Sequence, residues 1–203
     1  SMDTQFDLDQ LDFSKSPDGL LPAVAQDAHS GAIRMLAFVD YEAVQTSLQT
    51  GLAHFYSRSK QRLWQKGEES GNVLRLIGIA TDCDHDAVIY SVQPTGPTCH
   101  TGAESCFFEG DEIMPQLAIL HQLEQVIAQR QQDAPRDSYV AELFASGLDR
   151  IAQKVGEEGV ETVIAAKNDD RDEFLNESAD LLFHLLILLR TKECSLAEVL
   201  QVL

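Results

Sequence analysis

Three of the four cysteines lie within one short stretch of the chain, at positions 83, 99 and 106. Their separations of 16 and 7 residues differ from the paired C-x-x-C spacing of a closed structural zinc site. Three thiolates on a tetrahedral Zn²⁺ leave one position for a water, whose pKa the metal lowers to about 7. We therefore expect Cys83, Cys99 and Cys106 to hold a catalytic zinc that activates a water. The alternative is that they are reduced thiols packed as small apolar side chains.

The neighbours of these cysteines favour the metal site. Cys83 lies between two aspartates, and Cys99 lies in the turn sequence Gly-Pro-Thr-Cys-His. A cysteine packed in a core would rarely have a carboxylate on either side, because each buried charge needs a partner. His100, which follows Cys99, is a candidate for proton transfer, and a purely structural role is its alternative.

Three aspartates alternate around the first of these cysteines, at Asp82, Asp84 and Asp86. On an extended backbone their carboxylates would share one face, while Cys83 and His85 would point to the other. We expect them to bind Mg²⁺ beside the zinc, open to a substrate phosphate. An EF-hand loop is excluded, because alanine and glutamine stand where its glycine and bidentate glutamate belong. A solvated acidic turn is the alternative.

Residues 57–72 form an island of positive charge in an otherwise acidic half of the chain. Guanidinium groups and exposed glycine amides suit phosphate oxygens, and a tryptophan could stack on a base. We expect this segment to contact substrate through six side chains: Arg58, Lys60, Arg62, Trp64, Lys66 and Ser70. The alternative is a solvated basic surface with the tryptophan anchored in the core.

A second group of carboxylates lies in the last third of the chain, at Glu157, Glu158, Glu161, Glu177 and Asp180. Helical spacing puts the first three on neighbouring positions of one helix and the last two on the next helix. If these helices pair, the carboxylates converge and repel unless cations lie between them. Oxygen-only ligands select Mg²⁺ or Mn²⁺, which would hold a polyphosphate and orient a water for attack on phosphorus. The alternative is that these carboxylates lie on solvated helix faces. Two features argue against it: Glu177 and Asp180 have apolar neighbours, and glycines at 156 and 159 interrupt the first helix despite their cost to helix stability.

The elements that must position these residues differ between the two halves. In the first half, alternating apolar residues and turn signals predict strands at 22–26, 32–39, 52–57, 73–80 and 87–92. Asp40 is expected to cap one helix that reaches Leu48 and ends at Gly51. Residues 3–19 are expected to form a short helical or loosely ordered lead-in.

The second half has apolar residues at helical spacing throughout. It predicts helices at about 114–131, 138–146, 148–167, 171–190 and 195–202. We therefore expect an α+β protein, with a mostly-β domain over residues 1–113 and an all-α domain over residues 114–203.

Composition and charge argue against several classes of function. The net charge is −18, with −10 in residues 1–113 and −8 in residues 114–203. Nucleic-acid binding is disfavoured, since it needs a basic surface. The longest apolar run, 181–189, is too short to span a bilayer, and no apolar run follows a basic segment as in a signal peptide. Clustered cysteines among acidic residues point to a reducing cytoplasm rather than a disulfide scaffold.

The motifs D-C-D-x-D, G-P-T-C-H and S-C-F together resemble phosphoribosyl-AMP cyclohydrolase, the histidine-biosynthesis enzyme that opens an adenine ring. The segment R-S-x-x-x-L-W-x-K-G-E-x-S-G is similar to that family as well, and the resemblance covers residues 18–107. It implies that the three cysteines bind zinc, that the three aspartates bind magnesium, and that the basic segment binds substrate.

The pattern E-E-x-x-E, followed after fifteen residues by E-x-x-D, resembles the all-α nucleotide pyrophosphohydrolases. The segment R-I-A-Q-K-V-G-E-E-G-V-E is similar to phosphoribosyl-ATP pyrophosphohydrolase in particular. This resemblance implies that the five carboxylates bind metal and that Arg150 and Lys154 contact phosphate.

The two families catalyse successive steps, so the whole chain resembles their bifunctional fusion. The resemblance implies that phosphoribosyl-ATP is cleaved to phosphoribosyl-AMP and pyrophosphate, and that a zinc-activated water then opens the adenine ring. It also implies a homodimer whose zinc ligands come from two chains. Two rival functions are a zinc nucleobase deaminase joined to a pyrophosphatase, whose H-x-E and P-C-x-x-C signatures are absent from the sequence, and a metal-binding interaction protein without enzymatic activity.

Overall fold

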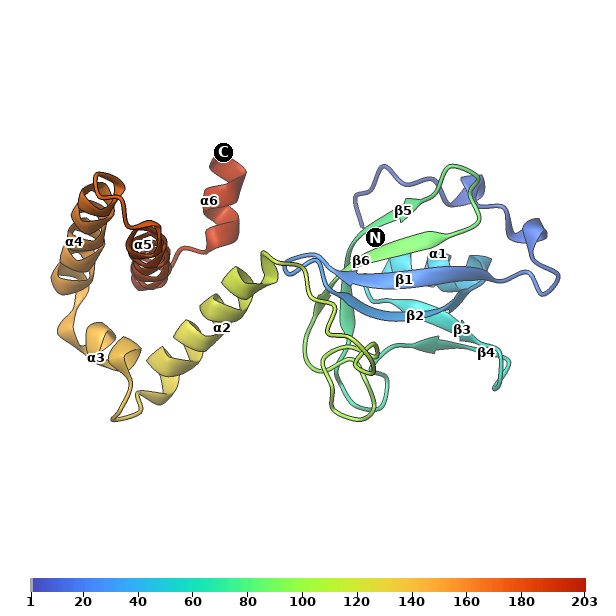
Figure 1. Cartoon of the computed structure of the whole chain (residues 1–203). Coiled ribbons are helices and arrows are strands. Elements are labelled where there is room, and N and C mark those ends of the chain that lie inside the picture. Colours follow the sequence, from blue (N-terminus) through green and yellow to red (C-terminus); the bar gives the residue numbers. More distant parts are fainter. Residues whose placement is uncertain (1) are drawn as a thin grey trace. The chain divides into compact units, whose positions relative to one another are not determined.

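The computed structural model describes residues 2–203 and divides into two compact units, the first ending at Ala118 and the second spanning Ile119–Leu203. The predicted domain boundary after residue 113 lies in the connector between the last strand and the first long helix. Strands dominate the first unit and helices form the second (Figure 1). The predicted α+β class, with a strand-rich first half and a helical second half, is confirmed.

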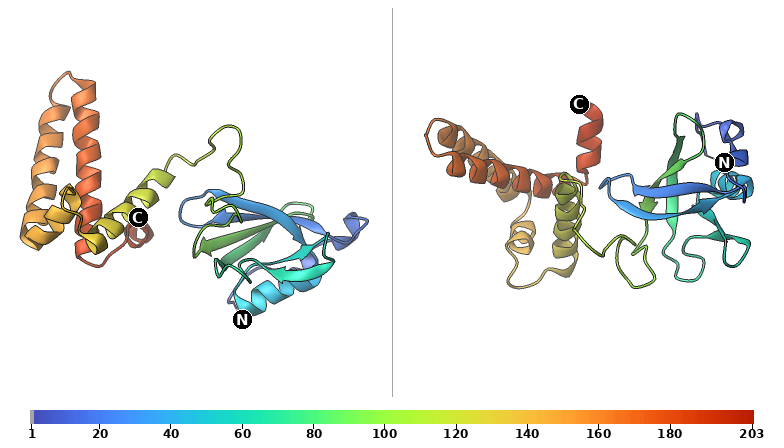
Figure 2. Two further views of the ribbon diagram at one scale, coloured as in Figure 1. Left: turned by 90° about the horizontal axis from the view of Figure 1, so that it is seen from below. Right: turned by 45° about the vertical axis from the view of Figure 1, so that its right-hand side comes forward.

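The first unit is built on one six-stranded sheet with the order β4-β3-β2-β1-β6-β5. Strands β1 and β6 pair in parallel, and all other neighbours pair antiparallel. Two 3-10 turns in the predicted lead-in precede the sheet, and α1 packs on one of its faces (Figure 2). The elements in chain order are η1 (Leu8–Gln10), η2 (Phe13–Lys15), β1 (Leu21–Asp27), β2 (Ile33–Val39), α1 (Tyr41–Thr50), β3 (His54–Ser57), β4 (Arg62–Gln65), β5 (Leu74–Thr81) and β6 (Val88–Pro94).

The sequence chemistry explains most of these elements. Every second residue of β1 is buried, as expected for a strand with one face on the core. Helix α1 begins where the Asp40 side chain accepts a hydrogen bond from the Ala43 amide. It ends at Gly51, whose φ of 73° is the left-handed conformation that glycine adopts without strain.

Two local predictions for the first unit are wrong. Strand β4 lies within residues 57–72, at positions where no strand was predicted. Only Leu63 and Trp64 of its four residues are apolar, and its stability comes from pairing with β3. The three aspartates lie on a tight turn rather than on an extended strand. That turn is set by His85, whose φ is 63°, and by the Asp82 Oδ1 atom, which accepts hydrogen bonds from the amides of Asp86 and Ala87.

The second unit consists of five helices: α2 (Ala118–Asp133), α3 (Tyr139–Ser146), α4 (Leu148–Ala166), α5 (Arg171–Thr191) and α6 (Leu196–Val202). Side chains of Ser138, Asp170 and Ser195 cap α3, α5 and α6. Helices α4 and α5 form the main pair, which Figure 2 shows side by side. The unit has its own core around Ile127, Ile151 and Ile187.

The predicted start of the first long helix at residue 114 is wrong, because α2 begins at Ala118. Pro115 disfavours helical backbone at Met114, and the preceding Ile113 is 88% exposed. Among residues 2–203, none of the helices combines the length and the hydrophobicity that a membrane crossing requires.

Candidate active sites

Two of the three predicted zinc ligands lie together on the loop that follows β6. The loop folds back on itself through the amide of Thr98, which donates to Glu104 O, and the amide of Cys99, which donates to Ala103 O. These bonds bring the thiols of Cys99 and Cys106 close enough for each to shift the pKa of the other. The loop therefore holds two of the three predicted sulfur ligands near each other.

The two thiols of this pair have different environments. Thr101 Oγ1 donates to Cys99 Sγ at 3.1 Å, and this bond lowers the pKa of Cys99. Desolvation raises the pKa of Cys106, and the adjacent Cys99 adds to the increase. A zinc ion would bind both groups as thiolates and release their protons.

Cys83 lies at the other end of β6 from this pair. It is exposed on the turn between β5 and β6, where Thr81 pairs with Val88. Cys99 follows the opposite end of the strand, where Leu74 pairs with Pro94. A strand of seven residues is roughly 20 Å long. One copy of the chain therefore does not bring Cys83 to the other two thiols.

A cavity of about 480 Å³ lies beside the thiol pair. Its lining includes Cys99 and His100 from the loop after β6 and five of the six predicted substrate contacts: Lys60, Arg62, Trp64, Lys66 and Ser70. The structure thus gathers residues from separate parts of the sequence around one cavity that has basic groups, an indole ring and a thiol. Such a cavity suits a phosphorylated nucleotide.

The sixth predicted contact, Arg58, lies elsewhere. Its guanidinium carbon is 3.9 Å from the centre of the Phe38 ring. It lines a different cavity, of about 450 Å³, together with Asp18 and Asp40. Within one copy, Arg58 is therefore not part of the cavity beside the thiol pair.

The acidic turn gathers Asp82, Asp84 and Asp86, each of which offers an oxygen within 4.8 Å of the others. Desolvation acts to raise the pKa of Asp82, but the amides of Asp86 and Ala87 outweigh it and lower that pKa to about 2. Desolvation and hydrogen bonding with Asp84 raise the pKa of Asp86. Lys15 Nζ lies 3.5 Å from Asp84 and 3.8 Å from Asp86, so one ammonium group already partly neutralises the cluster.

A second carboxylate cluster lies between α4 and α5, where Glu158, Glu161 and Glu177 each offer an oxygen within 4.8 Å of the others. The Oε2 atoms of Glu158 and Glu177 are buried without a hydrogen-bond partner among residues 2–203. Burial and the neighbouring Glu161 carboxylate raise the pKa of Glu177. Three converging carboxylates, two of them with a buried oxygen that has no partner, are a donor set that fits a hard divalent cation.

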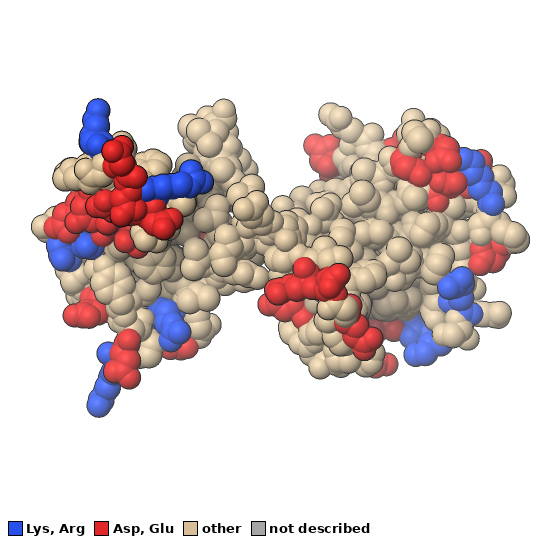
Figure 3. Space-filling view, in the orientation of Figure 1, with Lys and Arg blue, Asp and Glu red and all other residues tan. Residues whose placement is uncertain are grey.

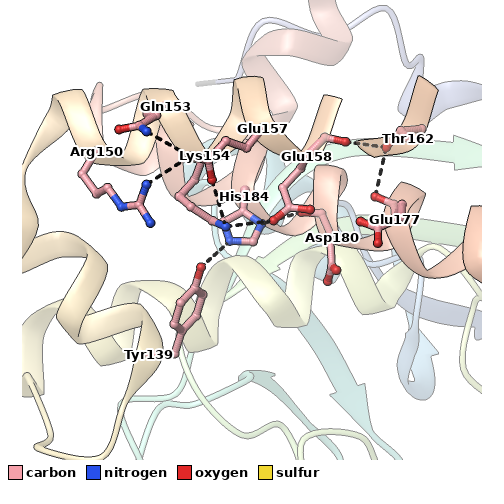
Figure 4. Close-up of polar contacts among 10 residues, drawn as sticks. All are labelled: Tyr139, Arg150, Gln153, Lys154, Glu157, Glu158, Thr162, Glu177, Asp180 and His184. Atoms are coloured by element: carbon pink, nitrogen blue, oxygen red, sulfur yellow. Dashed lines mark hydrogen bonds and ion pairs between the residues drawn. The ribbon is translucent and has the colours of Figure 1, made fainter. Parts of the chain in front are cut away.

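The other predicted residues of this half surround the cluster (Figure 4). Glu157 points away from it, toward Arg150 Nη1 at 3.3 Å and Lys154 Nζ at 3.4 Å. Lys154 Nζ is also 3.1 Å from Glu158 Oε1, and this contact raises the pKa of Lys154. Burial acts to raise the pKa of Glu158, but Lys154 outweighs it and the pKa is lowered. Asp180 lies close enough to Glu177 to raise the pKa of that residue further.

Comparison with known families explains why two such clusters occur in one chain. The family model described as phosphoribosyl-AMP cyclohydrolase matches residues 35–108, and the one described as phosphoribosyl-ATP pyrophosphohydrolase matches residues 120–203. Proteins named "Histidine biosynthesis bifunctional protein HisIE" match nearly the whole chain. The one from Shewanella oneidensis is 48% identical over 97% of this chain and 90% of its own length, and the one from Escherichia coli K12 is 50% identical over 95% and 93%.

The chain belongs to the bifunctional cyclohydrolase–pyrophosphohydrolase family of histidine biosynthesis. It is therefore a two-step hydrolase, with the cyclohydrolase half in the first unit and the pyrophosphohydrolase half in the second. This membership rules out both rival functions, the nucleobase deaminase joined to a pyrophosphatase and the non-enzymatic metal-binding protein.

The pyrophosphohydrolase half contains two polar residues that the sequence did not single out. His184 is buried at 5% exposure, and its Nδ1 donates to Asp180 O at 2.7 Å. Its Nε2 is therefore free to accept from the Tyr139 hydroxyl at 2.7 Å in the neutral ring. His184 Nδ1 also lies 3.9 Å from Glu158 Oε1. The signal in the sequence was the one histidine inside the apolar run 181–189.

Proposed function

We propose that the pyrophosphohydrolase half holds Mg²⁺ with Glu158, Glu161 and Glu177, and that Asp180 is a further ligand beside them. Glu157 pairs with Arg150 and Lys154 instead and is not one of the proposed ligands. The observation that supports this most strongly is the pair of buried carboxylate oxygens without partners, on Glu158 and Glu177. When bound, Mg²⁺ supplies charge neutralisation for a polyphosphate. Arg150 and Lys154 lie on the same helix, toward its N-terminus, and are the proposed contacts for phosphate oxygens.

The substrate of this half is then phosphoribosyl-ATP. Water attacks a phosphorus atom of the P–O–P linkage between the first and second phosphates, the bond from that phosphorus to the bridging oxygen breaks, and the products are phosphoribosyl-AMP and pyrophosphate. When they are ionised, the carboxylates of the cluster accept hydrogen bonds and donate none. They are therefore suited to orient the attacking water by accepting from its O–H groups.

We propose further that the cyclohydrolase half holds zinc with Cys99 and Cys106 of one copy and Cys83 of a second copy. This proposal is supported by the closeness of the first two thiols and by the position of Cys83 at the far end of β6. When bound, zinc supplies Lewis-acid activation of water. A homodimer follows from this arrangement, and thiol ligands need a reducing compartment, so we propose the cytoplasm as the place of action.

The cavity residues would then hold phosphoribosyl-AMP. Lys60, Arg62, Lys66 and Ser70, which line the cavity, are the proposed contacts for its phosphate groups, and Trp64 is the proposed contact for its base or its ribose. Water adds at C6 of the adenine ring, the C6–N1 bond breaks and N1 takes a proton. His100, which lines the cavity, is the proposed group for proton transfer. The acidic turn of Asp82, Asp84 and Asp86 is the proposed Mg²⁺ site of this half.

The test is to incubate the full chain with phosphoribosyl-ATP and to follow pyrophosphate and the ring-opened product separately. Cys99→Ala should abolish ring opening, with a loss larger than the roughly 10- to 100-fold typical when a contact behind a metal ligand is removed, while pyrophosphate release persists. Glu158→Gln should abolish pyrophosphate release, while added phosphoribosyl-AMP is still opened. Loss of both reactions in either variant, with the fold intact, would contradict two separate metal sites.

A further inference from the structure

A buried arginine, Arg34, lies beneath the loop that holds the thiol pair. It is the second residue of β2 and only 7% exposed, which is uncommon for an arginine. The strand register shifts here, since Gln26 pairs with Ile33 and Ala25 with Met35. Arg34 therefore occupies a β-bulge, a feature that re-aims one side chain away from the regular pattern of the sheet.

The guanidinium group of Arg34 binds the loop on both sides of Cys99. Its Nε donates to Thr98 Oγ1 at 3.2 Å and its Nη2 donates to Gly96 O at 3.2 Å. Its Nη1 lies 3.7 Å from Glu104 Oε2. Thr98 and Glu104 are also joined by a backbone hydrogen bond, so the guanidinium fork sits at the closed base of the loop.

The backbone of Arg34 holds the second thiol of the pair. Its carbonyl oxygen accepts from the amide of Cys106 at 2.8 Å and from Ser105 Oγ at 3.3 Å. Ser105 Oγ donates as well to Ile33 O at 2.7 Å. One residue of the sheet thus fixes the chain next to both Cys99 and Cys106.

We infer that Arg34 is the positioning residue of the Cys99–Cys106 thiol pair and sets its zinc affinity. This inference rests on the proposed zinc site. Contacts behind a metal ligand fix the orientation of that ligand before the metal binds. They therefore reduce the entropy cost of ordering the site when the metal binds. The planar fork of arginine serves several acceptors at fixed angles, which the single ammonium of lysine does not.

The test measures zinc affinity of the full chain by competition with a chromophoric chelator. Arg34→Met keeps the bulk of the side chain and removes its donors, and it should weaken zinc binding by about 10- to 100-fold, as for other contacts behind metal ligands. Arg34→Lys keeps the charge and should also be weaker than wild type. Arg75→Met is the matched control, because Arg75 is an exposed arginine on β5, and it should bind zinc like wild type.

The free energy of unfolding in urea is measured on the same variants. If Arg34 were only structural, folded Arg34→Met and Arg34→Lys would lose stability and yet bind zinc with wild-type affinity, and that result would overturn the inference. Should Arg34→Met fail to fold, Arg34→Lys alone decides. A wild-type chain that binds no zinc would overturn the proposed zinc site itself, whereas equal affinities in all variants would overturn only the role of Arg34.

Discussion

A carboxylate whose buried oxygen has no partner is the most informative single residue of the pyrophosphohydrolase half. In the cluster of Glu158, Glu161 and Glu177, burial and like charges raise the pKa of Glu177. A raised pKa in the folded state means that ionisation of this acid destabilises the fold. The protein therefore carries a local electrostatic cost near neutral pH that a divalent cation would remove.

Glu177→Gln should therefore raise the midpoint of thermal unfolding in the presence of a chelator, because it removes one buried like charge. Its benefit should be full at neutral pH, shrink as the pH falls below the raised folded-state pKa of Glu177, and vanish below the ordinary pKa of glutamate, where the folded and unfolded wild-type carboxyls are both protonated. Calorimetry as a function of pH measures both effects. Glu142→Gln is the control, since Glu142 is exposed on α3, and a shift as large as that of Glu177→Gln would contradict the explanation.

Residue types and spacing were enough to predict the ligand candidates, but not the residues that hold them in place. The cysteines and carboxylates stood out because their chemistry is local to a motif. Arg34 contacts partners at least 62 positions away and Tyr139 bonds a histidine 45 positions away. Contacts of that kind depend on the tertiary fold, and no pattern along the chain indicates them.

At the scale of elements, the helix pair α4–α5 positions the acidic cluster. Its turn ends at Asp170, whose side chain accepts from the amide of Glu173 at 3.1 Å. This bond satisfies one of the amide groups left open at the start of α5. Helix α5 carries Glu177 two turns further on, so the cap helps to fix where the cluster forms.

Asp170→Ala should lower the free energy of unfolding of the helical unit by about 1 kcal/mol, the usual value of an N-cap. Urea unfolding followed by circular dichroism at the helical band measures the change. Asp169→Ala is the matched control, because Asp169 is the exposed neighbour that does not cap the helix. Equal effects of the two substitutions would show that charge near the helix start, rather than the cap, determines stability.

The ends of elements with strong local signals were predicted within one or two residues. Elements with weak local signals were missed or placed incorrectly. Helices α3 to α6 have caps or long apolar stripes that mark their ends. Strand β4 has neither, and it exists because it pairs with β3 and packs Trp64 against Phe55 at a ring distance of 5.5 Å. The three aspartates were expected to share one face of extended backbone, yet their carboxylates meet on a turn that contains the left-handed residue His85.

At the scale of the whole molecule, the chain is two enzymes with separate cores. One core contains Phe55, Tyr90 and Val92, and the other contains Ile127, Ile151 and Ile187. Acidic side chains gather over both units on the face drawn in Figure 3, and basic side chains lie there in small groups. A negatively charged surface of this kind is suited to metal-bound phosphate compounds rather than to nucleic acid.

Separate production of residues 1–118 and 119–203 should give two folded proteins, each with one of the two activities. The reason is that each unit buries its own core and contains its own cluster of ligands. Pyrophosphate release by the second fragment and ring opening by the first are the two measurements. Failure of either fragment to fold would show that its core depends on the other unit.

In the cyclohydrolase half, each proposed zinc centre takes Cys83 from one copy and Cys99 and Cys106 from the other. The most direct measurement mixes two inactive variants, Cys83→Ala and Cys99→Ala, lets the subunits exchange, and follows ring opening of phosphoribosyl-AMP. A mixed dimer has one intact site of two, and random pairing makes half of the dimers mixed, so we expect recovery to about a quarter of wild-type activity. No recovery after verified exchange would contradict the shared centre.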